Sequence, residues 1–166
     1  MPERHPIVCN TTPLLAIIAA VGNLDVIRPL YSRVFVPREV ADELLIFNLT
    51  RFGAREFQAA SWIERVEEKM PLDVFLNNAL DSGEAAVIQL AITRRVARVA
   101  IDELPGRRIA RLYGLQVTGS IGMLLKVKQQ GHPMAMREMI NRMLQQGIHF
   151  SPALIQRALN LAGEFL

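Results

Sequence analysis

The stretch IVCNTTPLLAI, residues 7–17, decides how the rest of the chain is interpreted. The apolar residues 7–9 are typical of a short buried strand. Pro13 suits the first position of a helix, where its missing N–H costs nothing, and Thr12 suits the N-cap before it. Between strand and helix stands Asn10, an amide at a place where a metal site would be expected to carry a carboxylate. The side chain at position 10 therefore bears on whether the protein cleaves a substrate or only binds one.

The composition is that of a globular protein. The 166 residues are 51% hydrophobic and 21% charged, which suits one packed domain, residues 1–166, and excludes a disordered chain. No apolar run approaches the ~20 residues that cross a bilayer, and the opening residues lack the apolar segment of a signal peptide. A single cysteine, Cys9, excludes an intrachain disulfide and a thiolate zinc site. We therefore expect a cytoplasmic protein with no membrane partner.

Short β-like runs alternate with helical runs along the chain, and strands separated by helices indicate a parallel sheet with right-handed crossovers. The predicted strands are Ile7–Cys9, Val34–Val36, Trp62–Val66, Arg98–Ile101 and Gln116–Thr118. The predicted helices lie near residues 13–22, 38–47, 50–60, 83–94 and 105–113, and three more fill the C-terminal part.

Polar side chains stand near the carboxyl ends of the predicted strands, where open parallel sheets bind ligands. Asn10 follows the first strand and Asp102 follows the fourth, each directly before a helix. Glu43 lies at the edge of the apolar stripe of its helix, a position that also suits a glutamate with a packed stem and a wet head. Glu84 lies on an inward face of its helix, although Asp81 and Glu84 also fit a capping box. The two roles can be divided, with Asp81 as the cap and Glu84 facing the site.

Oxygen ligands without a nearby histidine or cysteine suit Mg²⁺ or Mn²⁺ and not zinc. The candidate ligands are Asn10, Glu43, Glu84 and Asp102. The three histidines show no ligand spacing, and the segment GSIGMLL lacks the lysine of a phosphate-binding loop. Ser120, in that segment, either adds a hydroxyl to the site or caps the next helix.

Arginines gather between residues 94 and 111. They are Arg94, Arg95, Arg98, Arg107, Arg108 and Arg111, set against two acids. The guanidinium fork matches phosphate oxygens, so this cluster favours nucleic acid as a partner, and a solvated helix surface is the alternative.

Taken in order, these motifs resemble those of the PIN-domain superfamily, in particular a VapC-like branch of prokaryotic proteins grouped with toxin–antitoxin modules. That branch opens with a strand followed by Asp-Thr-Ser-Pro-Leu, which is matched here by NTTPL at residues 10–14, with Asn in place of Asp and Thr in place of Ser. The segments VPREVADELL, LDSGEAAVIQLA and IDELPGRRIARLYGLQVTGSIGMLL look like its next three motifs, and GIHFSPALIQRAL fits its usual ending. The likeness spans nearly the whole chain.

The resemblance implies an α/β fold of the PIN-like type, with three α/β/α layers, a central, mainly parallel, roughly five-stranded twisted sheet and a helical C-terminal part. It also implies a ribonuclease that depends on Mg²⁺ or Mn²⁺, is commonly a homodimer and is often inhibited by a small antitoxin protein. Asp102, Glu84 and Glu43 would be ligands or water-positioning groups, and Asn10 takes the place of the first acid. The residues expected to contact RNA are Arg107, Arg108, Arg111, Thr12 and Ser120.

Asn10 departs from the family pattern, in which this residue is ordinarily Asp. An amide oxygen can coordinate a hard cation, but it brings no charge and cannot accept a proton from water. We therefore expect weak metal binding and weak or lost cleavage. Two alternatives to a ribonuclease stay open: a catalytically degraded PIN-like protein that binds RNA or a partner protein, and a Rossmann-like binder of a small ligand or a phosphotransfer domain.

Overall fold

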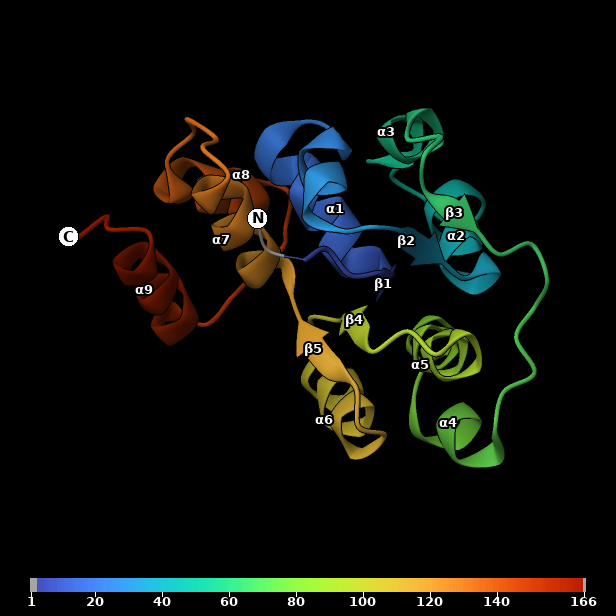
Figure 1. The fold of residues 1–166 in the computed structure, drawn as a ribbon. Helices are drawn as coiled ribbons and strands as arrows, with labels where there is room; N and C mark the ends of the chain where they lie inside the picture. Colours follow the sequence, from blue (N-terminus) through green and yellow to red (C-terminus); the bar gives the residue numbers. More distant parts are fainter. Residues whose placement is uncertain (1–2, 166) are drawn as a thin grey trace.

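The computed structural model describes residues 3–165 and has a sheet of five parallel strands with helices on both faces (Figure 1). The strands are β1 (Ile7–Cys9), β2 (Val34–Val36), β3 (Glu64–Arg65), β4 (Arg98–Ala100) and β5 (Gln116–Thr118). Their spatial order is β3-β2-β1-β4-β5. The α-helices are α1 (Thr11–Val21), α2 (Arg38–Leu45), α3 (Ala54–Ala59), α4 (Val74–Ala79), α5 (Ser82–Arg94), α6 (Leu104–Leu112), α7 (Ser120–Gln129), α8 (Met136–Gln145) and α9 (Pro152–Leu161). A 3₁₀ helix, η1 (Asp25–Leu30), follows α1.

The order of the strands places a crevice beside the central strand. β1 pairs with β2 on one side and with β4 on the other, so that Val8 lies opposite both Phe35 and Val99. The chain runs outward from β1 to β2 and β3 in one direction and from β4 to β5 in the other. Crossovers that diverge in this way leave a crevice beyond the carboxyl ends of the two strands where they part, here β1 and β4.

Helices cover both faces of the sheet, which confirms the predicted three-layer α/β/α fold. On one face α1 packs against α7 and α8, with α9 beyond them, and on the other α5 lies between α4 and α6 (Figure 1). β1 is buried on both sides of the sheet: its residues Ile7, Val8 and Cys9 are all apolar, and none is accessible to solvent. No helix in residues 3–165 combines the length and the apolar character needed to cross a membrane.

Some predicted boundaries are wrong. Helix α1 begins at Thr11 with Asn10 as its N-cap, so Thr12 is not the cap. Pro13 occupies the third helical position, which is tolerated because the first N–H groups of a helix have no partner within it. β3 is shorter than predicted, being an edge strand that pairs only with β2. Neither η1 nor α4 was predicted, because their short sequences carry little periodic pattern.

The first layer of helices provides a direct test of the core. Leu14 of α1 is fully buried, whereas Leu49, after α2, is 97% exposed. We expect Leu14→Ala to lower the free energy of unfolding by about 2–5 kcal/mol, because it removes buried methyl groups and leaves a cavity. The same change at Leu49 should stay within about 0.5 kcal/mol. Urea unfolding of both variants measures the difference, and equal effects would contradict this core.

Candidate active site

Asn10 stands where β1 ends and α1 begins, at the crevice between β1 and β4. Its backbone N–H donates to the carbonyl oxygen of Ala100 at 3.0 Å, which ties the ends of the two strands together. The residue is only 5% exposed, and its side chain makes no capping hydrogen bond to α1. The amide oxygen instead lies 3.4 Å from the position that a Cβ on Gly83 would take. Asn10 therefore faces the first turn of α5.

Glu43 reaches the same place from α2. Its Oε2 accepts a hydrogen bond from the Thr11 hydroxyl at 2.7 Å, which holds the carboxylate beside the start of α1. Its Oε1 lies so near Gly83 that a Cβ there would collide with it. Only glycine at position 83 lets the Glu43 carboxylate and the Asn10 amide approach the first turn of α5 so closely.

Glu84 faces the site while its neighbour caps the helix. The carboxylate of Asp81 accepts the backbone N–H of Glu84 at 2.9 Å, as an N-cap does. The Glu84 side chain turns inward, and the residue is 6% exposed. Its Oε2 lies 3.1 Å from the position of a Cβ on Gly106, in the first turn of α6. Capping and site-facing roles are thus divided between Asp81 and Glu84, one of the two arrangements that the sequence allowed.

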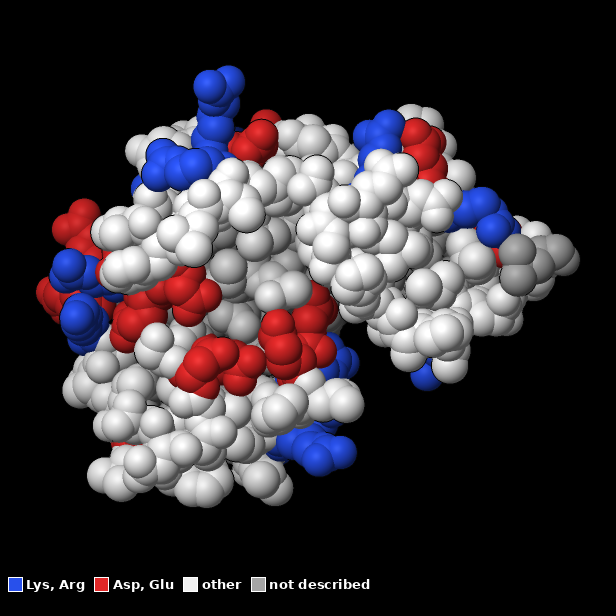
Figure 2. Space-filling view, turned by 180° about the vertical axis from the view of Figure 1, so that it is seen from behind, with Lys and Arg blue, Asp and Glu red and all other residues white. Residues whose placement is uncertain are grey.

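The acids repel one another, and burial adds to the effect. Burial raises the pKa of Glu84 to about 7, and repulsion by Asp81, Glu103 and Glu43 contributes in the same direction. Burial also raises the pKa of Glu43, against the lowering effect of the Thr11 hydrogen bond, while Asp81 and Glu103 add repulsion. These carboxyl groups therefore lie near enough to one another for their charges to interact. Figure 2 shows acidic side chains gathered around a hollow in one face of the molecule.

Asp102 lies across the crevice and is held by α7. Its Oδ1 accepts the backbone N–H of Ser120 at 2.7 Å, and its Oδ2 accepts the Ser120 hydroxyl. Burial raises the pKa of Asp102, the two bonds from Ser120 lower it, and Glu103 and Arg107 act in opposite directions. Gly119 takes the N-cap position of α7, so Ser120 does not cap this helix.

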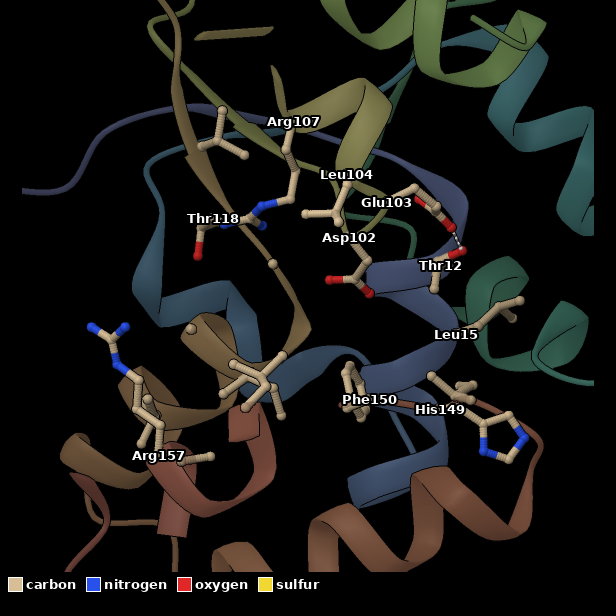
Figure 3. A pocket seen from close by; sticks show the side chains of 18 of the residues that line it. Thr12, Leu15, Asp102, Glu103, Leu104, Arg107, Thr118, His149, Phe150 and Arg157 are labelled. Carbon is tan, nitrogen blue, oxygen red and sulfur yellow. Dashed lines mark hydrogen bonds between the residues drawn. The ribbon is translucent and has the colours of Figure 1, made fainter. Parts of the chain in front are cut away.

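The residues predicted to contact RNA lie in different environments. Thr12, Arg107 and Arg111 line a pocket of about 1000 Å³, shown in Figure 3, in which the Thr12 hydroxyl donates to Glu103 at 2.9 Å. Arg107 is half-buried and its Nη1 donates to the carbonyl oxygen of Ile101 at 2.8 Å. Arg108 is exposed and outside this pocket. Ser120 is fully buried, which argues against direct contact with RNA; the other roles stay predictions.

Glu103 is the site residue that sequence reasoning missed. It is the N-cap residue of α6, and its charge raises the pKa of Glu43, Glu84 and Asp102 alike. The available signal was its place beside Asp102 at the start of a helix. In the sequence, Glu103 is one of the two acids that stand among the arginines of residues 94–111.

The donor set suits a hard cation in kind but is short of one charge. Within residues 3–165, no three His, Cys, Asp or Glu side chains come close enough to hold a metal ion together. Around Gly83 and the start of α5 the structure instead gathers two carboxylates, of Glu43 and Glu84, and the amide of Asn10. Oxygen donors of these kinds fit Mg²⁺ or Mn²⁺, and a cation would relieve the repulsion among the acids. An acid at position 10 would supply the third carboxylate.

Comparison with known proteins supports this assignment of the fold. A family model described as a PIN domain matches residues 6–164, which include every strand of the sheet and all of the site residues named above. No curated protein sequence matches the chain.

The raised pKa of Glu84 predicts how stability depends on pH. At a pH between the ordinary pKa of 4.5 and the raised pKa of about 7, Glu84 keeps its proton in the folded chain but loses it in the unfolded chain. The contribution of Glu84 to the free energy of unfolding is therefore complete below pH 4.5 and is lost as the pH rises through 7. We expect the free energy of unfolding of Glu84→Gln, relative to that of the natural chain, to rise by about 1–2 kcal/mol from pH 5 to pH 8, after allowance for solvent screening. Urea unfolding at both pH values measures this.

Glu138, an exposed glutamate on α8, provides the control. Glu138→Gln should show no comparable gain at the higher pH. If Glu84→Gln and the natural chain differ in free energy of unfolding by the same amount at both pH values, the carboxyl group at position 84 does not have a raised pKa.

Proposed function

The chain belongs to the PIN-domain family, which has a nuclease-type fold, and from this premise we propose that it is a ribonuclease dependent on Mg²⁺ or Mn²⁺, with a weakly bound metal and low activity. The observation that carries the proposal is the meeting of Asn10, Glu43 and Glu84 at the first turn of α5, with Asp102 and Glu103 across the crevice. Acids from three separate segments gather there although they repel one another. Such an arrangement suits the binding of a cation.

The residues of the chain take distinct parts in this proposal. Asn10, Glu43 and Glu84 would hold the cation, and a divalent ion bound by such groups activates water and stabilises the leaving oxygen of a phosphodiester. Thr11 orients Glu43 through its hydroxyl. Burial raises the pKa of Glu84 to about 7, so this carboxyl group would give up its proton on binding the cation, which favours the charged form.

Two further groups support the proposal from the other side of the crevice. Ser120 fixes both oxygens of Asp102, so that this carboxylate keeps one orientation. Arg107 and Arg111 line the adjoining pocket, where guanidinium groups suit the phosphates of RNA.

Asn10 accounts for the low activity in this proposal. Its amide oxygen can contact a cation without neutralising it, so the site attracts a divalent ion less strongly than three carboxylates do. The amide also eases the crowding of charge around Glu43 and Glu84. The natural site is therefore easier to fold and poorer at holding metal.

Restoring the acid tests the enzyme directly. We expect Asn10→Asp to cleave single-stranded RNA in Mn²⁺ about tenfold to a hundredfold faster than the natural chain, the scale on which supporting groups of metal sites act. Cleavage of a panel of labelled RNAs, resolved on gels, measures the rate.

Asn141, an exposed residue of α8, offers a matched control, because Asn141→Asp makes the same chemical change far along the chain and should leave the rate unchanged. Adding Glu43→Gln to Asn10→Asp should abolish the gain. If Asn10→Asp and the natural chain both leave every RNA intact in Mg²⁺ and Mn²⁺, the chain is not a ribonuclease.

We extend the proposal to the setting in which the protein works. The branch that the motifs resemble supports a toxin-type role for a single cytoplasmic domain, residues 1–166, that forms a homodimer and is inhibited by a small antitoxin protein. These statements depend on that resemblance and on the match to residues 6–164.

A second candidate function is the binding of RNA without cleavage, in a catalytically degraded PIN-like protein. The observation that favours it is Asn10 in a site where residues 3–165 bring no three acids together. We expect the natural chain to bind single-stranded RNA in EDTA, with an affinity that falls steeply with salt because arginines replace counterions on the phosphates. Arg111→Gln should reduce the slope of log K against log salt by about one. Fluorescence anisotropy across a salt series measures both, and affinity lost in EDTA would contradict binding without metal.

A further inference from the structure

A long groove leads from the acidic residues to the C-terminal helix α9. It is the pocket of about 1000 Å³ shown in Figure 3, a volume at the upper end of the range for ligand pockets. Asp102 and Glu103 lie at one end of it, and Arg157 of α9 and the segment 147–150 line the other. Asp102 and Glu103 belong to both the groove and the candidate active site, whereas Asn10, Glu43 and Glu84 do not line the groove. A chain-like ligand with one unit at Asp102 and Glu103 would have its next unit in the groove.

The lining combines an apolar surface with positive charge. The apolar part is formed by Leu15, Ile121, Leu125, Leu154, Ala158 and Leu161. Arg107, Arg111 and Arg157 add guanidinium groups, and Arg107 lies beside Asp102, which with Glu103 supplies the acidic side chains of the lining. An apolar surface bordered by arginines fits a nucleotide, whose base is flat and apolar and whose phosphate is an anion.

Phe150 gives the groove an aromatic surface. It lies between α8 and α9, and Figure 3 shows its side chain directed into the pocket, with His149 beside it. Phe150 is half-buried, packs against the core and lines the groove. An aromatic side chain in such a place can stack on a base.

We propose that this groove binds an unpaired nucleotide of RNA next to the one at the acidic site, with its base against Phe150 and its backbone phosphate at Arg157. The inference rests on the proposed function and names the part of the substrate that the chain recognises beyond the scissile position. A base stacked on Phe150 cannot also stay paired in a duplex, so the groove selects single-stranded RNA. The arginines favour this polyanion over a protein segment, the other occupant that an apolar groove can take.

The test separates base from backbone. Two labelled probes of equal length are compared in EDTA: an oligoadenylate and a ribose-phosphate chain of abasic residues that carries the same charge without bases. We expect Phe150→Leu to reduce the preference for the oligoadenylate about fivefold or more. Arg157→Gln should lower the affinity for both probes alike and reduce the slope of log K against log salt by about one.

Arg142, exposed on α8 and outside the groove, provides the matched control, since Arg142→Gln should change neither quantity. Melting curves show whether each variant is folded. If Phe150→Leu does not fold, Arg157→Gln still tests the proposal. RNA binding that neither Phe150→Leu nor Arg157→Gln alters overturns the nucleotide site and leaves a protein segment as the occupant. Absence of RNA binding by the natural chain also overturns it, whereas cleavage by Asn10→Asp, measured separately, decides the proposed function.

Discussion

Repulsion among carboxylates at the starts of neighbouring helices is the constraint on which this site depends. Five acids share the crevice, and four of them receive a hydrogen bond: Glu43 from Thr11, Asp81 from the Glu84 backbone, Asp102 from Ser120 and Glu103 from Thr12. Glu84 is the fifth acid, and within residues 3–165 no hydrogen bond reaches its carboxylate. Its pKa is the one raised to about 7. The positive ends of α1, α5, α6 and α7 offset part of the remaining repulsion. A protonated Glu84 or a bound cation completes the balance.

The sequence predicted the strands at the centre of the sheet well, because β1 and β2 are apolar runs that are buried along their whole length. Both begin and end where predicted, as does β5, a more exposed strand at the edge of the sheet. β3 lies at the edge and has only one partner, so local pattern overstated its length. Helices α4 and η1 were missed because six residues are too few to show a helical period.

The site was harder to predict, because sequence shows where a side chain starts but not where it ends. Asn10 and Asp102 were located from the strands that precede them, and Glu84 from its place on a helix. Glu103 lies one residue from Asp102 yet forms its own contact with Thr12, and only the turn into α6 reveals that its charge faces the other acids. Ser120 shows the reverse case, since a hydroxyl that suited RNA in the sequence is buried against Asp102.

Positive and negative side chains both line the groove. Arg107 of α6 lies beside Asp102, and Arg157 of α9 adds a positive charge from the C-terminal helix. RNA held only by the arginines would bring its phosphates toward carboxylates that repel them. A cation between the two resolves this conflict, and so does protonation of Glu84, which lowers the negative charge of the crevice near neutral pH. Asn10 acts in the same sense as protonation, because an amide at the end of β1 removes one charge permanently. In the proposed function, this amide eases the approach of RNA to the crevice, at the expense of the charge that would hold a metal there.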